Sequence, residues 1–180
     1  CLFLVSLLLN LCLANSTYLE MVSACMEIET TRDIAHQIVR HRSFSFQEFS
    51  QRYANPAEFG SQFVPREARL QDQKNRQNSI ETVDTELIGQ WIIKQNEVIN
   101  VARQAYEWAI ENGIAKEQAR VVLPEGNTKT RLYMNGTIRS WVHYIDLRGA
   151  NGTQKEHMEI AHACAKVVAT VFPIIDKLDH

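Results

Sequence analysis

The chain has 180 residues, of which 45% are hydrophobic and 22% charged, and its formal net charge is −2 at pH 7. These values are typical of one globular domain. The near balance of charge argues against a general nucleic-acid binder, which needs clustered positive charge. The small numbers of glycine, proline and cysteine residues argue against collagen-like, disordered and disulfide-dense proteins.

The first fourteen residues are almost wholly apolar but shorter than the roughly 20 residues of a bilayer span. They resemble the apolar region of a signal peptide, and sequons at Asn15, Asn135 and Asn151 would then fit a secreted glycoprotein. However, no basic segment precedes the run, and the chain does not open with Met. We therefore favour a truncated or aberrant N-terminal segment over residues 1–16, followed by one domain over residues 17–176.

The four cysteines are Cys1, Cys12, Cys25 and Cys164, and no two of them have C-x-x-C spacing. Zinc ribbons and thioredoxin-like redox motifs are therefore not supported. Cys25 and Cys164 lie among apolar residues, where a free cysteine usually packs as a small core side chain. We expect both to be buried and neither to be catalytic.

The first half of the chain shows three local patterns. Residues 20–29 alternate between apolar and polar, which predicts a strand with one buried face. A helical pattern follows the capping residue Thr31 and should end near Arg40. Residues 53–82 are polar and contain proline, which predicts a long surface excursion that is functional or mobile.

The second half is predominantly helical. A long helix should begin at Asp84 or Thr85 and end at Asn112-Gly113, because apolar residues recur at three- and four-residue spacing between them. Further elements are predicted as a short helix over residues 115–121, a strand over 128–135, a helix capped by Thr137 that runs to Leu147, and a last helix opened by a Thr153–Glu156 capping box. This order predicts an α+β domain, a small sheet packed with long helices.

Several familiar signatures are missing. The chain has no G-x-G-x-x-G, no phosphate-binding P-loop and no G-x-S-x-G nucleophile elbow. His157 and His162 are five residues apart on a predicted helix, so their side chains should diverge rather than share a metal ion. We therefore predict no metal site.

Residues 40–53, which read RHRSFSFQEFSQRY, concentrate arginine, serine and aromatic side chains just after a predicted helix. Arginine binds phosphates and carboxylates through two parallel hydrogen bonds, and its flat guanidinium also stacks on rings. This composition suits an anionic, aromatic ligand such as a nucleotide. A solvated charged turn, with Glu48 paired to an arginine, is the alternative that the composition leaves open.

A second group of cations lies in the C-terminal half and comprises Arg120, Arg131, Arg139, His143 and Arg148. Arg139 and His143 are four residues apart, so they share one helix face and could serve one ligand. For each arginine taken alone, a surface ion pair is the favoured interpretation, and the case for a ligand rests on the group as a whole.

The segment 40–53 resembles the R-H-R-x-x-S-x-x-E-x-S-x-R-Y signature of the flavin-dependent thymidylate synthases, the ThyX family, at every fixed position. The similarity continues through residues 120–124 and 130–148 and covers most of the chain from Thr17 to Phe172. This resemblance implies a ThyX-like fold and a homotetramer with active sites shared between subunits, with neither nucleic acid nor a membrane as a partner. It also implies a cytoplasmic enzyme, in which the three sequons are coincidental. It also implies methylation of dUMP to dTMP with FAD as cofactor, methylenetetrahydrofolate as one-carbon donor and NADPH as reductant.

The resemblance further implies roles for particular residues. The dUMP site would comprise Gln37, Arg40, Glu48, Ser50, Gln51, Arg52, Arg120 and Arg148. The FAD site would comprise Thr17, Arg40, His41, Arg42, Glu48, Thr137, Arg139 and His143. Arg148 would be the catalytic residue, because a fixed guanidinium near the uracil ring stabilises the negative charge that develops there.

Residues 15–20 depart from the family pattern, because the usual histidine and proline around the Thr17 position are replaced. This departure leaves a second hypothesis open, a truncated and catalytically inactive homologue that still binds the nucleotide. The secreted glycoprotein is the third.

Overall fold

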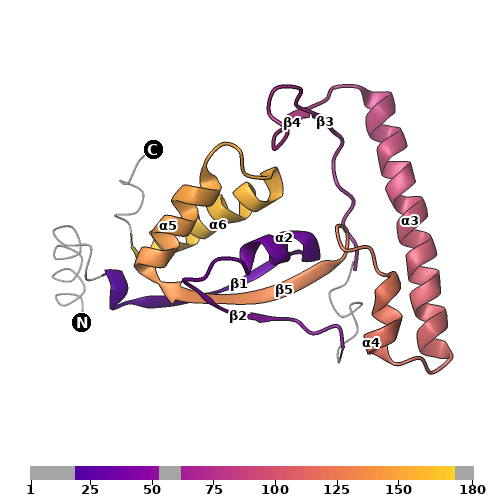
Figure 1. The fold of residues 1–180 in the computed structure, drawn as a ribbon, viewed down its shortest axis with the longest axis horizontal. Coiled ribbons are helices and arrows are strands. Elements are labelled where there is room, and N and C mark those ends of the chain that lie inside the picture. Colours follow the sequence, from indigo (N-terminus) through magenta and orange to yellow (C-terminus); the bar gives the residue numbers. More distant parts are fainter. Residues whose placement is uncertain (1–18, 53–61, 173–180) are drawn as a thin grey trace. The chain divides into compact units, whose positions relative to one another are not determined.

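The computed structural model of the chain describes residues 19–52 and 62–172 (Figure 1). Its elements in chain order are β1 (Ser23–Thr31), α2 (Arg32–Ile38), β2 (Ser45–Glu48), β3 (Arg69–Gln71), β4 (Ser79–Glu81), α3 (Thr85–Glu111), α4 (Lys116–Ala119), the short 3-10 helix η3 (Arg120–Val122), β5 (Lys129–Thr137), α5 (Ile138–Gly149) and α6 (Lys155–Val171). The mixture of helices and strands confirms the α+β class.

The strands form two sheets. The larger has the order β1-β5-β2, and β3 and β4 form an antiparallel hairpin in which Leu70 is opposite Ile80. Side chains of β1 and β5 alternate between buried and exposed positions, as period-two strands with one covered face should. The chain also divides into two compact units, and the boundaries fall inside β1, α2, β2 and β5.

The first unit contains the described residues 19–28, 38–47 and 133–172. Helix α5 begins where predicted, because the Thr137 hydroxyl accepts a hydrogen bond from the Ser140 N–H at 3.2 Å. The Trp141 ring N–H donates to the Ala24 carbonyl of β1 at 3.1 Å, which ties α5 to the strand. Helix α6 packs against α5 (Figure 1) and buries its residues His157, Ala161, Cys164 and Val168.

The second unit contains the described residues 29–37, 48–52 and 62–132. Helix α3 spans the predicted range: the Asp84 carboxylate accepts from the Glu86 and Leu87 N–H groups, and Gly113 with φ 74° follows its end. A core cluster joins α3 to the segments around it through Phe63, Ile99, Tyr106, Ala109, Ala119 and Leu123. Among the described residues of the second unit, this cluster covers only the C-terminal part of the predicted apolar face of α3.

Three predictions need correction. Cys25 is exposed, because it occupies an outward position of β1, whereas Cys164 is buried as predicted. Helix α6 has Gln154 at its N-cap position and no side-chain cap, so the Thr153–Glu156 capping box is wrong. The polar excursion contains the β3–β4 hairpin, which its composition did not predict; residues 53–61 lie outside the described part of the chain.

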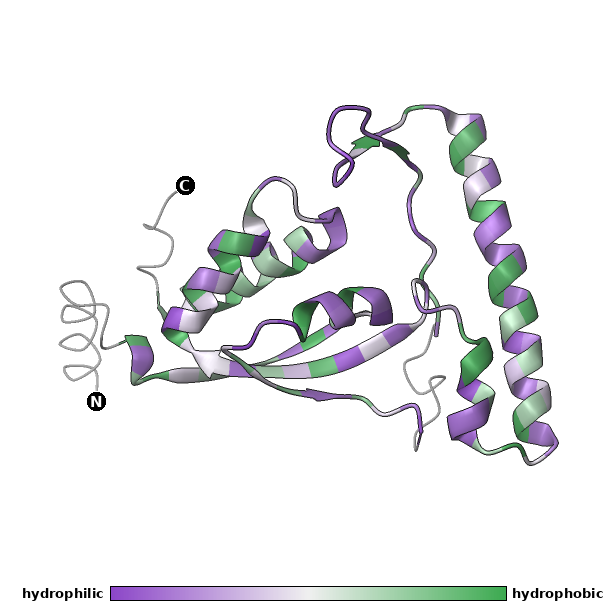
Figure 2. Ribbon diagram, in the orientation of Figure 1, coloured by the Kyte–Doolittle hydropathy of each residue, from purple (hydrophilic) through white to green (hydrophobic). Residues whose placement is uncertain are grey.

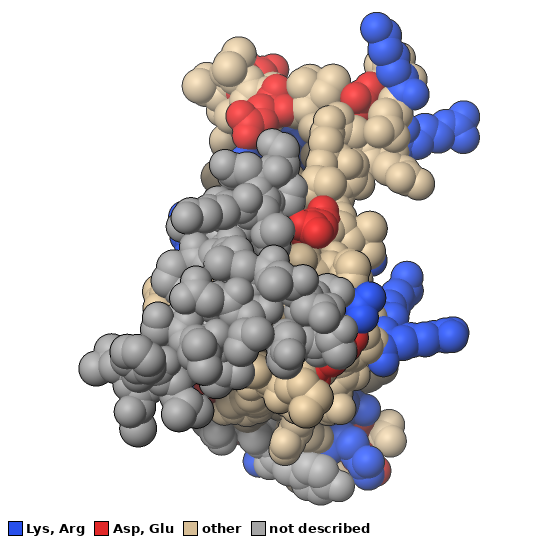
Figure 3. Space-filling view, turned by 90° about the vertical axis from the view of Figure 1, so that its left-hand side faces the viewer, with Lys and Arg blue, Asp and Glu red and all other residues tan. Residues whose placement is uncertain are grey.

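The surface is mixed in character. Hydrophobic residues recur along the whole length of α3, drawn green in Figure 2. Where Figure 3 shows described residues, a few acidic side chains lie among uncharged ones, and most of the basic side chains project along the right-hand edge. Across residues 19–52 and 62–172, no helix is both long enough and apolar enough to cross a membrane.

Candidate functional site

The first unit brings together two residues that are far apart in the sequence, His41 and Arg148. His41 follows α2 in a turn closed by its N–H on the Ile38 carbonyl at 3.1 Å, and Arg148 lies in the last turn of α5. The Nε–H of Arg148 donates to Nε2 of His41 at 2.9 Å. The arginine-rich segment after α2 and the end of α5 therefore meet through this bond.

This hydrogen bond fixes the protonation state of His41. A guanidinium has no acceptor atom, so Nε2 of His41 must accept and the ring must be neutral with its proton on Nδ1. Burial and the positive charge of Arg148 both lower the pKa of His41 from its ordinary value. The site thus presents a cationic arginine beside a neutral imidazole.

The ring of Tyr144 lies against His41 and belongs to a cluster of aromatic side chains with Phe44 and Trp141. The edge of the Tyr144 ring meets the His41 ring with centroids 5.0 Å apart, and Phe44 packs edge-on against Trp141 at 4.9 Å. Tyr144 and Trp141 are fully buried on α5. The rings exclude water from one side of the imidazole, which explains why the pKa of His41 is lowered.

Behind Tyr144 lies His157 of α6, which is 0% exposed. Its Nε2 and the Tyr144 hydroxyl are 3.1 Å apart and share a hydrogen bond. Burial, with smaller contributions from Arg148 and His41, lowers the pKa of His157 to about 4, and burial raises the pKa of the Tyr144 hydroxyl well above its usual range. Both groups are therefore uncharged at neutral pH.

The residues predicted for FAD lie in several settings. Arg40 and Arg42 are exposed and form no ion pair with any described residue. The hydroxyl of Thr137 caps α5 and donates to Glu20 at 3.0 Å, and Arg139 pairs with the same carboxylate at 3.1 Å. His143 is exposed on α5, and Thr17 lies outside the described residues.

Glu48, predicted for both ligands, has partners within the second unit. Its Oε1 accepts from Arg32 at 3.1 Å and from the Thr130 hydroxyl at 2.8 Å. The ion pair expected for a solvated turn is therefore present, although its partner is Arg32 of α2 rather than an arginine of residues 40–53.

The other residues predicted for dUMP, apart from Arg40 and Arg148, also belong to the second unit. Arg52 is half exposed and pairs with Glu117 at 3.2 Å, while the Nε–H of Arg120 donates to the Glu117 backbone carbonyl at 3.3 Å. Gln51 is buried, and its Nε2 has no hydrogen-bond partner in the described part of the chain. Gln37 and Ser50 are half-buried. Arg131, of the second cation group, pairs with Glu29.

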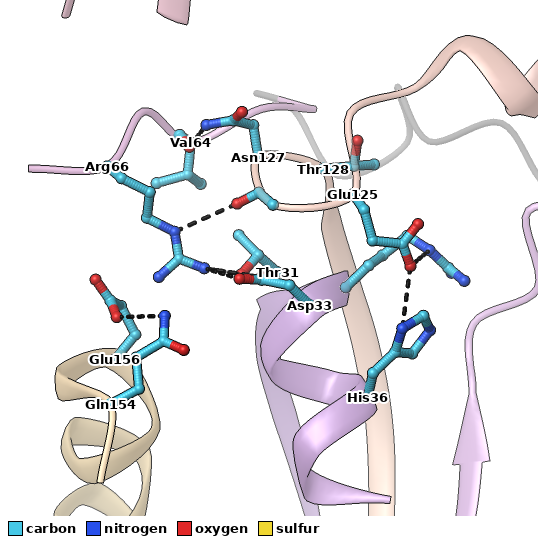
Figure 4. A network of polar contacts seen from close by, with 12 residues as sticks. Thr31, Asp33, His36, Val64, Arg66, Glu125, Asn127, Thr128, Gln154 and Glu156 are labelled. Carbon is cyan, nitrogen blue, oxygen red and sulfur yellow. Dashed lines mark hydrogen bonds and ion pairs between the residues drawn. The ribbon is translucent and has the colours of Figure 1, made fainter. Parts of the chain in front are cut away.

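A polar network in the second unit was not predicted from the sequence (Figure 4). NH2 of Arg66 donates to the Thr31 hydroxyl at 2.5 Å and to both carboxylate oxygens of Asp33 at 2.8 and 3.1 Å. In Figure 4 its side chain points from the excursion toward the start of α2. The amide of Gln95 accepts from the Arg66 N–H and donates to its carbonyl, at 2.7 and 2.8 Å. These residues anchor the segment that precedes the β3–β4 hairpin.

The burial and pairing of Tyr144 and His157 were not predicted either, although the sequence pattern could have indicated that His157 is buried. His157 is the first member of the buried series on α6, with Ala161, Cys164 and Val168 at spacings of four, three and four residues. A search for apolar residues alone overlooks a histidine on the buried face of a helix. Nothing in the sequence pairs it with Tyr144.

Comparison with known proteins places this chain in a family. The family model described as thymidylate synthase complementing protein matches residues 6–174. The chain belongs to the thymidylate synthase complementing protein family. The predicted resemblance is thereby confirmed.

Relatives in the thymidylate synthase complementing protein family align over most of this chain. A protein of Synechocystis sp. named flavin-dependent thymidylate synthase is 49% identical over 171 residues, 93% of this chain and 77% of that protein. One of Paramecium bursaria Chlorella virus 1, named probable flavin-dependent thymidylate synthase, is 46% identical over 172 residues, 94% of this chain and 78% of that protein. A flavin-dependent thymidylate synthase of Aquifex aeolicus is 37% identical over 155 residues, 79% of this chain and 48% of that protein.

Proposed function

We propose that the protein is a flavin-dependent thymidylate synthase, which methylates dUMP to dTMP with FAD as cofactor, methylenetetrahydrofolate as one-carbon donor and NADPH as reductant. The observation that carries this proposal is the identity of 46–49% to proteins of that name over most of the chain. Within the aligned region, the arginine-rich signature at residues 40–53 is complete.

The residues that would hold FAD fit an anionic ligand with a flat ring. Arg40 and Arg42 have no internal carboxylate among the described residues, so their guanidinium groups suit phosphate oxygens. The other members of the proposed site are His41, Glu48, Thr137, Arg139, His143 and Thr17. When bound, FAD supplies the hydride chemistry, and the protein's part is to bind and to orient.

Arg148 is proposed as the catalytic residue. Its Nε–H is engaged by His41, which restricts rotation of the guanidinium and leaves the two terminal nitrogens for a ligand. A positive charge held in this way stabilises negative charge on a uracil ring without reorganising as the charge develops. For dUMP we further propose Gln37, Arg40, Glu48, Ser50, Gln51, Arg52 and Arg120.

We also propose that the protein is a homotetramer with active sites shared between subunits. The support is the set of large apolar side chains exposed on α3 in the single chain, which are Leu87, Trp91, Ile92, Ile93, Val98, Val101 and Trp108. An exposed apolar surface of this kind is typical of an interaction site.

Two measurements test the proposed function. The purified protein should show a flavin absorption spectrum, or acquire one on reconstitution with FAD, and should oxidise NADPH faster when dUMP is added. With methylenetetrahydrofolate present, dTMP should form. A protein that binds dUMP but neither takes up FAD nor makes dTMP would instead be the inactive nucleotide-binding homologue.

The variant Arg148→Ala tests the catalytic assignment. It should retain FAD and much of its affinity for dUMP, but lose dTMP formation by at least about a hundredfold, as expected when a charge-stabilising group is removed. Arg76→Ala, which removes an exposed arginine near the β3–β4 hairpin, is the matched control. Equal turnover in Arg148→Ala and the control would remove Arg148 from the mechanism.

A further inference from the structure

The proposed function leaves two buried polar side chains without a role. Tyr144 and His157 are 1% and 0% exposed. An apolar side chain could fill either position in the core between two helices without needing a hydrogen-bond partner. Buried polar groups must be hydrogen-bonded, and these two satisfy one another at 3.1 Å. Their position directly behind His41 suggests a purpose for this arrangement.

A continuous series of contacts leads from α6 to Arg148. The His157 and Tyr144 rings lie 5.8 Å apart, and the edge of Tyr144 meets His41 at 5.0 Å. His157 also lies edge-on to His41 at 6.3 Å. His41 then accepts the hydrogen bond from Arg148. Each ring is therefore restrained by the one behind it.

We propose that Tyr144 and His157 are positioning residues, which hold the His41 ring with its Nε2 lone pair aimed at the Nε–H of Arg148 and so fix the orientation of that guanidinium. The proposal rests on the proposed function for the role of Arg148. Neither positioning residue is expected to touch dUMP or the flavin.

No negative charge in the described part of the chain holds the His41 ring in place, so its orientation depends on packing. Among residues 19–52 and 62–172, the titratable groups that face it are Arg148 and Tyr144 from α5 and His157 from α6, and none of these three is an acid ionised at neutral pH. A flipped imidazole would direct a C–H, and a ring protonated on Nε2 would direct an N–H, at the guanidinium, and in either case the hydrogen bond would be lost. Packing by neutral rings holds the ring in the one orientation that accepts.

Three variants separate the steps. Tyr144→Phe removes the hydroxyl but keeps the ring edge against His41. His157→Leu removes the hydrogen-bonding group, while His157→Gln retains one, because the glutamine Nε2 can reach the position of the imidazole Nε2. His162→Gln is the matched control on the same helix, since His162 is exposed and a glutamine can keep its 3.2 Å contact with the Gly149 carbonyl oxygen.

The kinetic expectation is a fall in kcat without an equal change in dUMP affinity. His157→Leu and Tyr144→Phe should lower kcat by at least about fivefold, the effect of one lost hydrogen bond, with the Kd for dUMP within about twofold. His157→Gln should recover most of kcat, and His162→Gln should match the unmodified protein. A loss of kcat that follows only the loss of thermal stability, without recovery in His157→Gln, would overturn the positioning role.

A second measurement does not depend on flavin or turnover. The chain has six histidines, so nitrogen-15 NMR of labelled imidazoles in the flavin-free protein, assigned with His41→Asn, can follow His41 alone. Its Nε2 should show the shift of an unprotonated acceptor, and in Tyr144→Phe and His157→Leu that signature should be lost as the ring averages between tautomers. A protonated Nε2 at neutral pH, or an unchanged signature in both variants, would overturn the proposal. If the NMR result holds while dTMP formation is absent, the proposed function fails and the positioning of Arg148 stands.

Discussion

Gly136 lies in β5 where the strand passes the ring of Phe44. A Cβ atom at this position would be 2.5 Å from Cδ1 of that ring. Phe44 is itself packed against Trp141, so it has little room to withdraw. The absence of a side chain at residue 136 is therefore a packing requirement for the wall of aromatic rings beside His41.

We predict that Gly136→Ala destabilises the protein by about 1–3 kcal/mol, the usual cost of overpacking. Urea-induced unfolding measures this directly. Gly89→Ala is the control, because Gly89 lies inside α3 with nothing within 4 Å of the added Cβ. That variant should gain roughly 0.5–1 kcal/mol from helix propensity. Equal stability of Gly136→Ala and the unmodified protein would show that Phe44 can move.

His157 predicts how stability depends on pH. Its pKa is about 4 in the folded protein, mainly through burial, against an ordinary value of 6.5. As the pH falls from about 6.5 to about 4, the unfolded chain binds a proton that the folded chain does not, so the free energy of unfolding decreases. The decrease from this residue can reach about 3 kcal/mol.

Unfolding measured over this pH range should show the decrease in the unmodified protein and in His162→Gln, whose histidine is exposed. In His157→Gln it should be smaller, because no imidazole remains to be protonated at that position. The same slope in all three proteins would contradict the assignment.

At the scale of elements, the excursion between β2 and α3 is held by polar contacts as well as by the apolar cluster. Gln95 is a buried polar residue on α3 and binds both backbone groups of Arg66, as a neighbouring strand would. Its Oε1 also accepts from Asn127 at 3.2 Å. One amide side chain thus satisfies backbone groups that lie outside any sheet.

We expect Gln95→Ala to lower the free energy of unfolding by about 1–3 kcal/mol, because the Arg66 N–H and carbonyl lose their partners on a partly buried surface. Hydrogen exchange should accelerate at the Arg66 amide. Lys94→Ala, one residue earlier and paired with exposed Glu97, should change stability by less than about 0.5 kcal/mol. An unaltered exchange rate at Arg66 would contradict this account.

At the scale of the whole molecule, much of α3 has no apolar partner among the described residues of the second unit. Val98 and Val101 line a shallow hollow together with Glu97, Ala102, Ala105 and Val122. Val101 is 66% exposed and Trp108 60%. The exposed apolar residues of α3 recur at helical spacing, but the core cluster does not cover them. This exposed apolar surface is the basis for the proposed assembly.

If α3 is a subunit interface, Val101→Asp should shift the protein to smaller species in sedimentation velocity, because a carboxylate would be buried without a partner. The flavin content should fall with it if active sites are shared. Val167→Asp places the same charge on α6, at a valine that is 55% exposed, and should leave the assembly intact. A monomeric unmodified protein would refute the interface.

Local patterns in the sequence determined several secondary-structure elements and the family of this protein. The alternation in β1, the Asp84 cap and Gly113 stop of α3, and the Thr137 cap of α5 depend on residues within a few positions of one another, so these elements could be predicted. The arginine-rich signature indicated the family by itself, because its fixed positions lie close together along the chain. The ligand roles of its residues stay predictions.

Only the tertiary structure decided which distant residues meet. Arg148 donates a hydrogen bond to His41, 107 positions away in the sequence. His157 is hydrogen-bonded to Tyr144, 13 positions away, and Arg66 forms an ion pair with Asp33, 33 positions away. Hydrophobic periodicity places a side chain on a face but does not choose its partner across an interface. The partner is chosen when each buried donor finds an acceptor, and that requirement is met only in the packed chain.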